Sequence, residues 1–279
     1  MNPLKAIILG LIQGVAEFLP ISSSGHLELT KNLFGLQDVP LLFDVLLHVA
    51  TLIVVATVFK KRLLAIIAAL WDFLFHRKKG PAKGMTKTRK HKDEVNKENL
   101  GYVVPLLIAT AVTGVIGVAI EKFVPSGGPK MVAARMLVTA AILLSTLAAK
   151  PGSLGIGTMG KGRAAFVGLA QGIGVFSGIS RSGISISAGL FSGLSREAAG
   201  EFSFILSIPA ILGALLLTLG DLGEMTAAVP LGHLALAFFS AMLSGFLSLK
   251  VLLRIVKGGK LYWFAPYLVV VGVLGLIFA

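Results

Sequence analysis

Polar and ionisable side chains are concentrated in two short segments of an otherwise apolar chain. The first segment contains Gln13, Glu17, three consecutive serines and His26, and the second contains Gln171, Arg181 and four further serines. Ionisable side chains in apolar surroundings cost free energy and usually serve a function. The two segments therefore hold the candidate site.

The second segment is suited to binding a phosphate group. Small residues surround Arg181, and a helix that begins nearby would present free backbone N–H groups to an anion. Arg can grip phosphate oxygens with two hydrogen bonds at once. The residues expected to contact the anion are small or carry a hydroxyl, and they are Ser22, Ser24, Gly25, Gly178, Ser180, Ser182, Gly183 and Ser185.

The first segment offers acid–base and metal-binding groups. Ser23 and His26 share a face if a helix starts near Ser23, so the imidazole can serve the hydroxyl as a base or an acid. Gln13 and Glu17 are one turn apart and can share a divalent cation, with phosphate oxygens completing the ligand set. Plainer roles remain open: Glu17 in a structural ion pair with Arg181, and His26 as a hydrogen-bonded packing residue.

Asp44 and His48 form a further pair with one-turn spacing. On a helix they would lie on one face. They either form polar contacts within the core or hold in place the residues that contact the ligand.

The composition places both segments in a membrane protein. Of the 279 residues, 55% are hydrophobic and 14% are charged, and the mean hydropathy is +0.88. A water-soluble domain with a polar surface is far less apolar. Because the chain has no cysteine, disulfides, thiolate metal sites and cysteine nucleophiles are excluded.

Six apolar runs approach or reach the roughly 20 residues that a helix needs to cross the hydrocarbon core. They are residues 41–59, 100–120, 131–149, 202–219, 231–253 and 261–279. The sequence thus predicts an all-α polytopic membrane protein with six transmembrane helices.

The net charge of +13 comes largely from Lys and Arg in three connections between apolar runs, 60–99, 150–163 and 250–260. These basic residues are poorly interleaved with aromatic residues, so nucleic acid is not an expected partner. By the positive-inside rule the three connections face the cytoplasm. The expected partner is the bilayer, and the expected location is the cell membrane that bounds the cytoplasm.

Within the first basic connection, residues 63–75 are apolar but short for a span. They are expected to form a helix in the membrane interface. Residues 77–98 are polar and rich in Lys, which indicates a solvated loop at the anionic leaflet.

The two polar segments are copies of one another. Residues 10–26 and 168–184 match at nine of seventeen positions, where composition alone would give about one or two matches. Three expected spans separate the copies, so the second copy should be upside down relative to the first. This pattern predicts an inverted repeat.

The repeat divides the chain into a first half, 1–149, and a second half, 150–279, within one membrane domain. Each half is expected to open with a re-entrant helix–loop–helix segment, 4–33 and 163–194, followed by three spans. In such folds the interrupted segments enter from opposite faces and meet near the midplane.

The motifs resemble those of the undecaprenyl-diphosphatase family, also known for bacitracin resistance. The resemblance rests on QGVAEFLPISSSGH at 13–26 and SGISRSGIS at 177–185, and it extends over essentially the whole chain. Two positions depart from the family pattern: Ser177 replaces a Pro, and Ser185 replaces a Thr. The first change is expected to loosen the turn that aims Arg181.

The resemblance implies hydrolysis of a polyprenyl diphosphate to the monophosphate and inorganic phosphate, which recycles the lipid carrier of envelope synthesis. It implies catalytic roles for Glu17, Ser23, His26 and Arg181. It also implies a divalent cation, Mg2+ or Ca2+, held by Glu17 with help from Gln13.

Two other functions stay open at this point. Inverted repeats with broken helices are the usual build of secondary transporters, so the chain could move a lipid phosphate across the membrane. It could also bind such a lipid without catalysis. A homodimer is likewise left open by the sequence.

Overall fold

The computed structural model describes residues 1–36, 39–75, 87–124, 127–150, 152–221 and 229–278. Eleven α-helices lie within these ranges, which confirms the all-α architecture there. In chain order they are α1 (Pro3–Phe18), α2 (Ser23–Leu33), α3 (Leu41–Val58), α4 (Lys60–Phe75), α5 (Lys87–Phe123), α6 (Pro129–Ser145), α7 (Lys161–Ile173), α8 (Arg181–Phe191), α9 (Arg196–Thr218), α11 (Leu231–Lys257) and α12 (Ala265–Phe278).

Six helical stretches in the described ranges are long and apolar enough to cross a membrane, and they coincide with the six predicted spans. They are Leu41–Val58, Glu98–Phe123, Pro129–Ala148, Arg196–Thr218, Leu231–Lys257 and Leu261–Phe278. The number and order of the spans were thus predictable from hydropathy. The protein is a multi-pass membrane protein.

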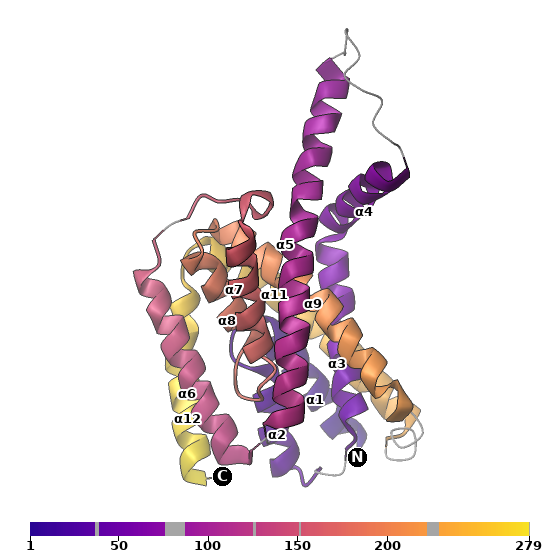
Figure 1. Cartoon of the computed structure of the whole chain (residues 1–279). Helices are drawn as coiled ribbons and strands as arrows, with labels where there is room; N and C mark the ends of the chain where they lie inside the picture. Colours follow the sequence, from indigo (N-terminus) through magenta and orange to yellow (C-terminus); the bar gives the residue numbers. More distant parts are fainter. Residues whose placement is uncertain (37–38, 76–86, 125–126, 151, 222–228, 279) are drawn as a thin grey trace.

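The prediction of a loop over residues 77–98 is wrong from Lys87 onward. There α5 has already begun, and it protrudes beyond the other helices at the end of the molecule where α4 lies (Figure 1). Lys, Glu and Arg are good helix formers, and neither Gly nor Pro interrupts residues 87–100. Residues 76–86 of this connection lie outside the described ranges. The expected helix over 63–75 is present as part of α4.

The helices pack in corresponding pairs. Helix α1 packs along α11, and α7 packs along α5, while α6 and α12 lie side by side (Figure 1). Gly10 and Gly168 occupy equivalent positions of the two sequence copies. A Cβ on Gly10 would collide with the carbonyl oxygen of Ala237 on α11, and one on Gly168 with the carbonyl oxygen of Ala109 on α5. Glycine at both positions lets the short helices approach the spans closely.

Two short helical hairpins, α1–α2 and α7–α8, are not among the six spanning stretches, although they pack against them. Their connecting loops, residues 19–22 and 174–180, both turn within the body of the molecule (Figure 1). These loops carry the polar residues singled out in the sequence.

Candidate active site

The two hairpins touch each other at their turns. The Ser182 hydroxyl donates a hydrogen bond to the carbonyl oxygen of Phe18 at 3.2 Å, which joins α8 to the end of α1. A Cβ on Gly25 would lie 3.1 Å from the Cα of Gly178, so the backbones of the two halves are nearly in contact. Side chains more than 150 residues apart in sequence are thereby brought to one place.

Each loop ends in the same capping arrangement. Ser22 is the N-cap of α2 and accepts a hydrogen bond from the backbone N–H of Gly25. Ser180 is the N-cap of α8 and accepts one from the backbone N–H of Gly183. A serine at this position satisfies an N–H group that the first helical turn leaves without a partner.

The two caps differ in backbone conformation. Ser22 has a φ of 70°, in the left-handed region, whereas Ser180 has an extended conformation with a φ of −77°. Among the described residues Ser22 is the one non-glycine residue with a positive φ. Such strain is tolerated where the surrounding structure holds a residue in place, which is common at functional sites.

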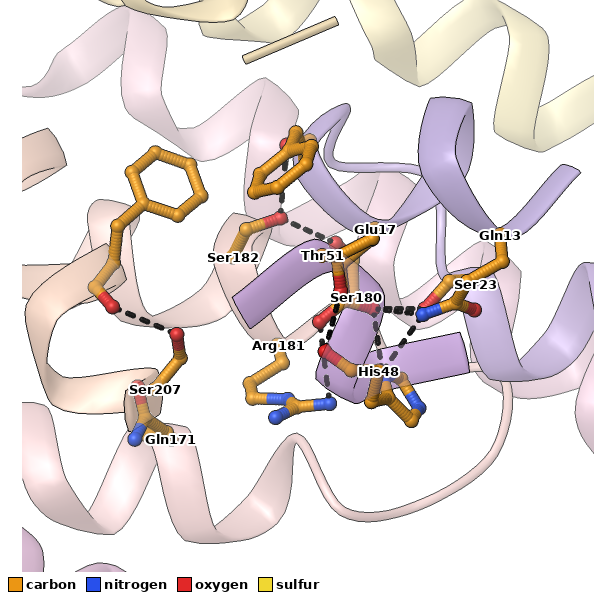
Figure 2. Close-up of polar contacts among 12 residues, drawn as sticks. Gln13, Glu17, Ser23, His48, Thr51, Gln171, Ser180, Arg181, Ser182 and Ser207 are labelled. Atoms are coloured by element: carbon orange, nitrogen blue, oxygen red, sulfur yellow. Dashed lines mark hydrogen bonds and ion pairs between the residues drawn. The ribbon is translucent and has the colours of Figure 1, made fainter. Parts of the chain in front are cut away.

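Glu17 is at the centre of the polar cluster (Figure 2). Its Oε2 atom accepts a hydrogen bond of 2.6 Å from the Ser23 hydroxyl and one of 3.2 Å from the Gln13 amide. On its other side, Arg181 Nη2 lies 3.5 Å from Glu17 Oε1. The Glu17 side chain is only 10% exposed, so these partners compensate a carboxylate that has little contact with solvent. The predicted ion pair between the halves is present.

His48, on α3, also contacts this cluster. Its Nδ1 atom lies 3.1 Å from Glu17 Oε2 and 2.8 Å from the Gln13 amide nitrogen. One ring nitrogen offers either a proton or a lone pair. A protonated Nδ1 donates to Glu17, and a deprotonated Nδ1 accepts from Gln13, so either tautomer of His48 keeps a contact with the cluster.

His26 points away from Ser23. Its Nδ1 atom lies 2.9 Å from the carbonyl oxygen of Ser22, and its Nε2 atom lies 2.8 Å from the hydroxyl of Tyr267 on α12. A carbonyl only accepts, so Nδ1 carries the proton and Nε2 accepts from the Tyr267 hydroxyl. No hydrogen bond joins His26 to Ser23 in the described part of the chain, and in this geometry His26 secures the first loop against α12.

A cavity of about 500 Å³ opens beside the cluster. Its polar wall includes Ser24 and His48 from the first half and Ser177 and Arg181 from the second. Charged side chains of both signs also line the cavity, and they are Glu28, Lys31, Asp44, Glu121 and Arg135. The main apolar residues of the lining are Leu27, Leu41, Val45, Ile120, Val124, Val175, Phe176, Ile211 and Leu217. A cavity with one polar and one apolar region suits an amphipathic molecule.

The residues predicted to bind the anion fall into two groups. Ser24 lines the cavity directly, and Ser182 lines a small cavity of about 20 Å³ that also borders Glu17 and Arg181. The others in the predicted set serve the protein's own contacts: they cap helices, allow close backbone approach or, in the case of Ser185, donate to the carbonyl oxygen of Arg181 at 2.7 Å. Arg181 therefore has a well-supported backbone.

The residues here offer few ligands to a metal ion. The described residues contain no cluster of three or more His, Asp or Glu side chains suited to a metal. Gln13 Oε1 is buried and has no hydrogen-bond partner among the described residues, and amide oxygens are ligands that Mg2+ and Ca2+ accept. With Glu17 it makes two oxygen donors, a partial set that phosphate oxygens of a ligand would have to complete.

Sequence reasoning missed or left open several residues of the site. The sequence left open whether Asp44 and His48 support the site or satisfy the core. His48 contacts Glu17 and Gln13, whereas Asp44 pairs with Lys31 at 2.7 Å. Tyr267 and Glu28 carried no signal, because nothing in a single sequence relates α12 or the second turn of α2 to the two loops. They are recognised only once the helices are packed.

The fold and the site define a polytopic helical membrane protein with a shielded serine–carboxylate–arginine cluster beside an amphipathic cavity. A sequence model described as bacitracin resistance protein BacA matches residues 6–274. The chain belongs to this family.

Curated relatives span the same length. The chain is 44% identical to an undecaprenyl-diphosphatase of Treponema denticola, over 98% of this chain and 96% of the relative. It is 38% identical to an undecaprenyl-diphosphatase of Desulfosudis oleivorans, over 98% and 97% of the two chains. A similar protein of the same description in Methanosphaera stadtmanae is 36% identical over 99% and 98%.

The contrast between the two caps gives a stability prediction. Ser22→Gly removes a cap but relieves left-handed strain, whereas Ser180→Gly removes a cap and relieves nothing. We expect Ser22→Gly to cost about 1 kcal/mol less free energy of unfolding than Ser180→Gly. Denaturation of both variants in detergent, followed by circular dichroism, measures the difference. Equal losses would show that the Ser22 backbone carries no strain.

Proposed function

We propose that the protein is an undecaprenyl-diphosphatase that converts undecaprenyl diphosphate to undecaprenyl monophosphate and inorganic phosphate. The observation that carries the proposal is the 2.6 Å hydrogen bond from Ser23 to Glu17 beside a cavity that Arg181 lines. A hydroxyl nucleophile, its base and an anion-binding cation are thus assembled in one place. Relatives of this description over the full length support it.

The cavity suits the two parts of this substrate. The diphosphate lies at the polar wall near Arg181 and Ser24, and the first part of the prenyl chain lies along the apolar wall formed by Leu27 and Val175. The remainder of the long tail stays in the bilayer between helices. Burying the apolar part lowers its free energy while Arg181 fixes the headgroup.

Ser23 is the nucleophile in this mechanism. Its oxygen attacks the terminal phosphorus, its proton passes to Glu17, and the bond from that phosphorus to the bridging oxygen breaks. Undecaprenyl monophosphate leaves and takes the proton from Glu17, and the phosphoryl group remains on Ser23. A water molecule then gives a proton to Glu17 as its oxygen attacks the phosphoserine. Inorganic phosphate is released, and Glu17 returns that proton to the Ser23 oxygen, which restores the hydroxyl.

Arg181 stabilises the charge that spreads over the transferred phosphoryl oxygens. Its 3.5 Å separation from Glu17 is long for a charged pair, so the guanidinium can turn from Glu17 to a bound phosphate at little cost. Arg181 is supported by the capped start of α8, whose positive end also favours an anion. His48 and Gln13 orient Glu17 during both steps.

Glu17 and Gln13 would hold a divalent cation, Mg2+ or Ca2+, together with oxygens of the diphosphate. When bound it neutralises part of the phosphate charge. The buried and unpartnered Gln13 Oε1 supports this assignment. His26, expected from the family resemblance to move a proton, is in this mechanism a positioning residue held by Tyr267.

The site also supports an inverted repeat of residues 1–149 and 150–279, with the hairpins α1–α2 and α7–α8 as re-entrant segments. Equivalent caps at Ser22 and Ser180 and equivalent glycine contacts on α11 and α5 support the relation. The basic connections lie at the cytoplasmic face of the cell membrane. The cavity extends to the ends of α5 and α9 at Glu121 and Thr218, so it opens to the outer face.

Purified protein in detergent is expected to release inorganic phosphate from undecaprenyl diphosphate, and Ser23→Ala is expected to abolish this release because no phosphoserine can form. Release is followed colorimetrically, and the phosphoserine is sought by acid quench of a single turnover. Ser145→Ala, which removes an exposed hydroxyl on α6, is the matched control. A wild-type protein that releases no phosphate would contradict the proposed function, and an active Ser23→Ala would contradict the nucleophile.

Arg181→Lys keeps the charge but loses the planar pair of donors. We expect kcat to fall by about 10²-fold or more, the loss typical of one transition-state contact. The initial rate of phosphate release measures this change, with Arg163→Lys at the exposed start of α7 as the control. Near-normal turnover of Arg181→Lys would show that a single positive charge, without the planar pair of donors, is sufficient for catalysis.

Removal of divalent cations is expected to stop turnover, and addition of Mg2+ or Ca2+ is expected to restore it, because Arg181 alone leaves the diphosphate charge largely uncompensated. The test compares phosphate release before and after chelation and after titration with each cation. Full activity in excess chelator would remove the metal from the mechanism.

A further inference from the structure

A hydrogen bond that the proposed mechanism does not use joins the two halves beside the site. The Ser177 hydroxyl donates to Glu28 Oε2 at 2.6 Å. Ser177 lies in the loop between α7 and α8, four residues before Arg181, and Glu28 is in the second turn of α2, the helix that begins at Ser23. The bond therefore connects the element that carries the nucleophile with the loop that leads to the anion-binding arginine.

The rest of the α7–α8 loop is held from α6. Arg135 Nη1 donates to the carbonyl oxygen of Ser177 at 3.4 Å, and the Thr139 hydroxyl lies 3.2 Å from the carbonyl oxygen of Gly178. The backbone N–H of Ser180 donates to the Thr139 hydroxyl at 3.1 Å. These contacts all come from α6. Glu28 holds the loop from α2, the helix that begins at Ser23.

Glu28 places a carboxylate in the cavity that is proposed to hold the diphosphate. Glu28 and Ser177 both line the 500 Å³ cavity, whose polar wall also contains Arg181. A carboxylate beside a bound diphosphate repels it, so Glu28 weakens binding unless it provides a compensating gain. The short hydrogen bond from Ser177 is such a gain if it fixes the turn from which Arg181 projects.

The residue type at position 177 also supports a role for Glu28 in restraining the turn. A Pro would restrict the turn by itself, because its ring fixes φ, whereas a Ser leaves φ free. The Ser177 N–H makes no backbone hydrogen bond in the described part of the chain, so the turn takes no restraint from that group. The side chain of Ser177 supplies the restraint instead, through Glu28.

We propose that Glu28 is a positioning residue that, by accepting a hydrogen bond from Ser177, holds the α7–α8 loop and aims Arg181 at the terminal phosphate opposite Ser23. The inference rests on the proposed function. It requires an acceptor oxygen at position 28 rather than a negative charge. It also predicts that the two side chains act as one unit.

The test compares Glu28→Ala, Ser177→Ala, the double alanine variant and Glu28→Gln. Each single alanine variant is expected to lower kcat about tenfold with a smaller change in KM, and the double variant to be no worse than either. Glu28→Gln keeps an acceptor oxygen and is expected to retain most of the activity. Ser177→Pro in the Glu28→Ala background is expected to restore turnover, since the ring replaces the lost restraint.

A second readout does not depend on hydrolysis. Inorganic diphosphate should raise the thermal midpoint of the wild-type protein, and that shift should shrink in Ser177→Ala as it does in Arg181→Lys, but not in Glu28→Gln. If the wild type releases no phosphate, the proposed function is wrong. The diphosphate-induced shifts of the thermal midpoint still test the positioning role of Glu28 in that case. A Glu28→Gln variant as impaired as Glu28→Ala would overturn the inference in favour of a charge at position 28, and additive losses in the double variant would show that the pair does not act together.

Discussion

The structure depends on keeping one carboxylate, Glu17, charged and partnered inside an apolar bundle. A carboxylate with little solvent contact is stable only with hydrogen bonds and an opposite charge around it. Its partners come from α1, α2, α3 and α8, and the last of these belongs to the second half of the chain. The requirement therefore fixes how the two hairpins meet and draws α3 against them.

The same constraint explains the use of small residues around the site. Glycine at positions 10 and 168 brings each short helix close to a spanning helix, and glycine at 25 and 178 brings the two loops together. Close backbone approach leaves little room for water, which strengthens the contacts between Glu17, Ser23 and Arg181. The hydroxyls of the serine-rich loops replace water as hydrogen-bond partners. Packing and chemistry are thus served by the same residues.

Most of the fold was predictable because hydropathy and the internal repeat are long signals. The six spans and the helix in residues 63–75 were found from apolar runs, but the early start of α5 at Lys87 was missed because polarity was interpreted as a loop. In the site, the roles of His26 and His48 could not be distinguished from the sequence. That choice depends on which face of each helix meets Glu17, and a single sequence does not contain this packing information.

The long interval between Glu17 and Arg181 has a consequence for biosynthesis. A ribosome that adds about 5 to 20 residues per second needs roughly 10 to 30 s to travel from the first residue to the second. During that time the carboxylate of the first hairpin lacks its cationic partner. Its nearby partners, Ser23, Gln13 and His48, are all made soon after or before it. These hydrogen bonds stabilise the Glu17 carboxylate in the nascent first half until Arg181 has been synthesised.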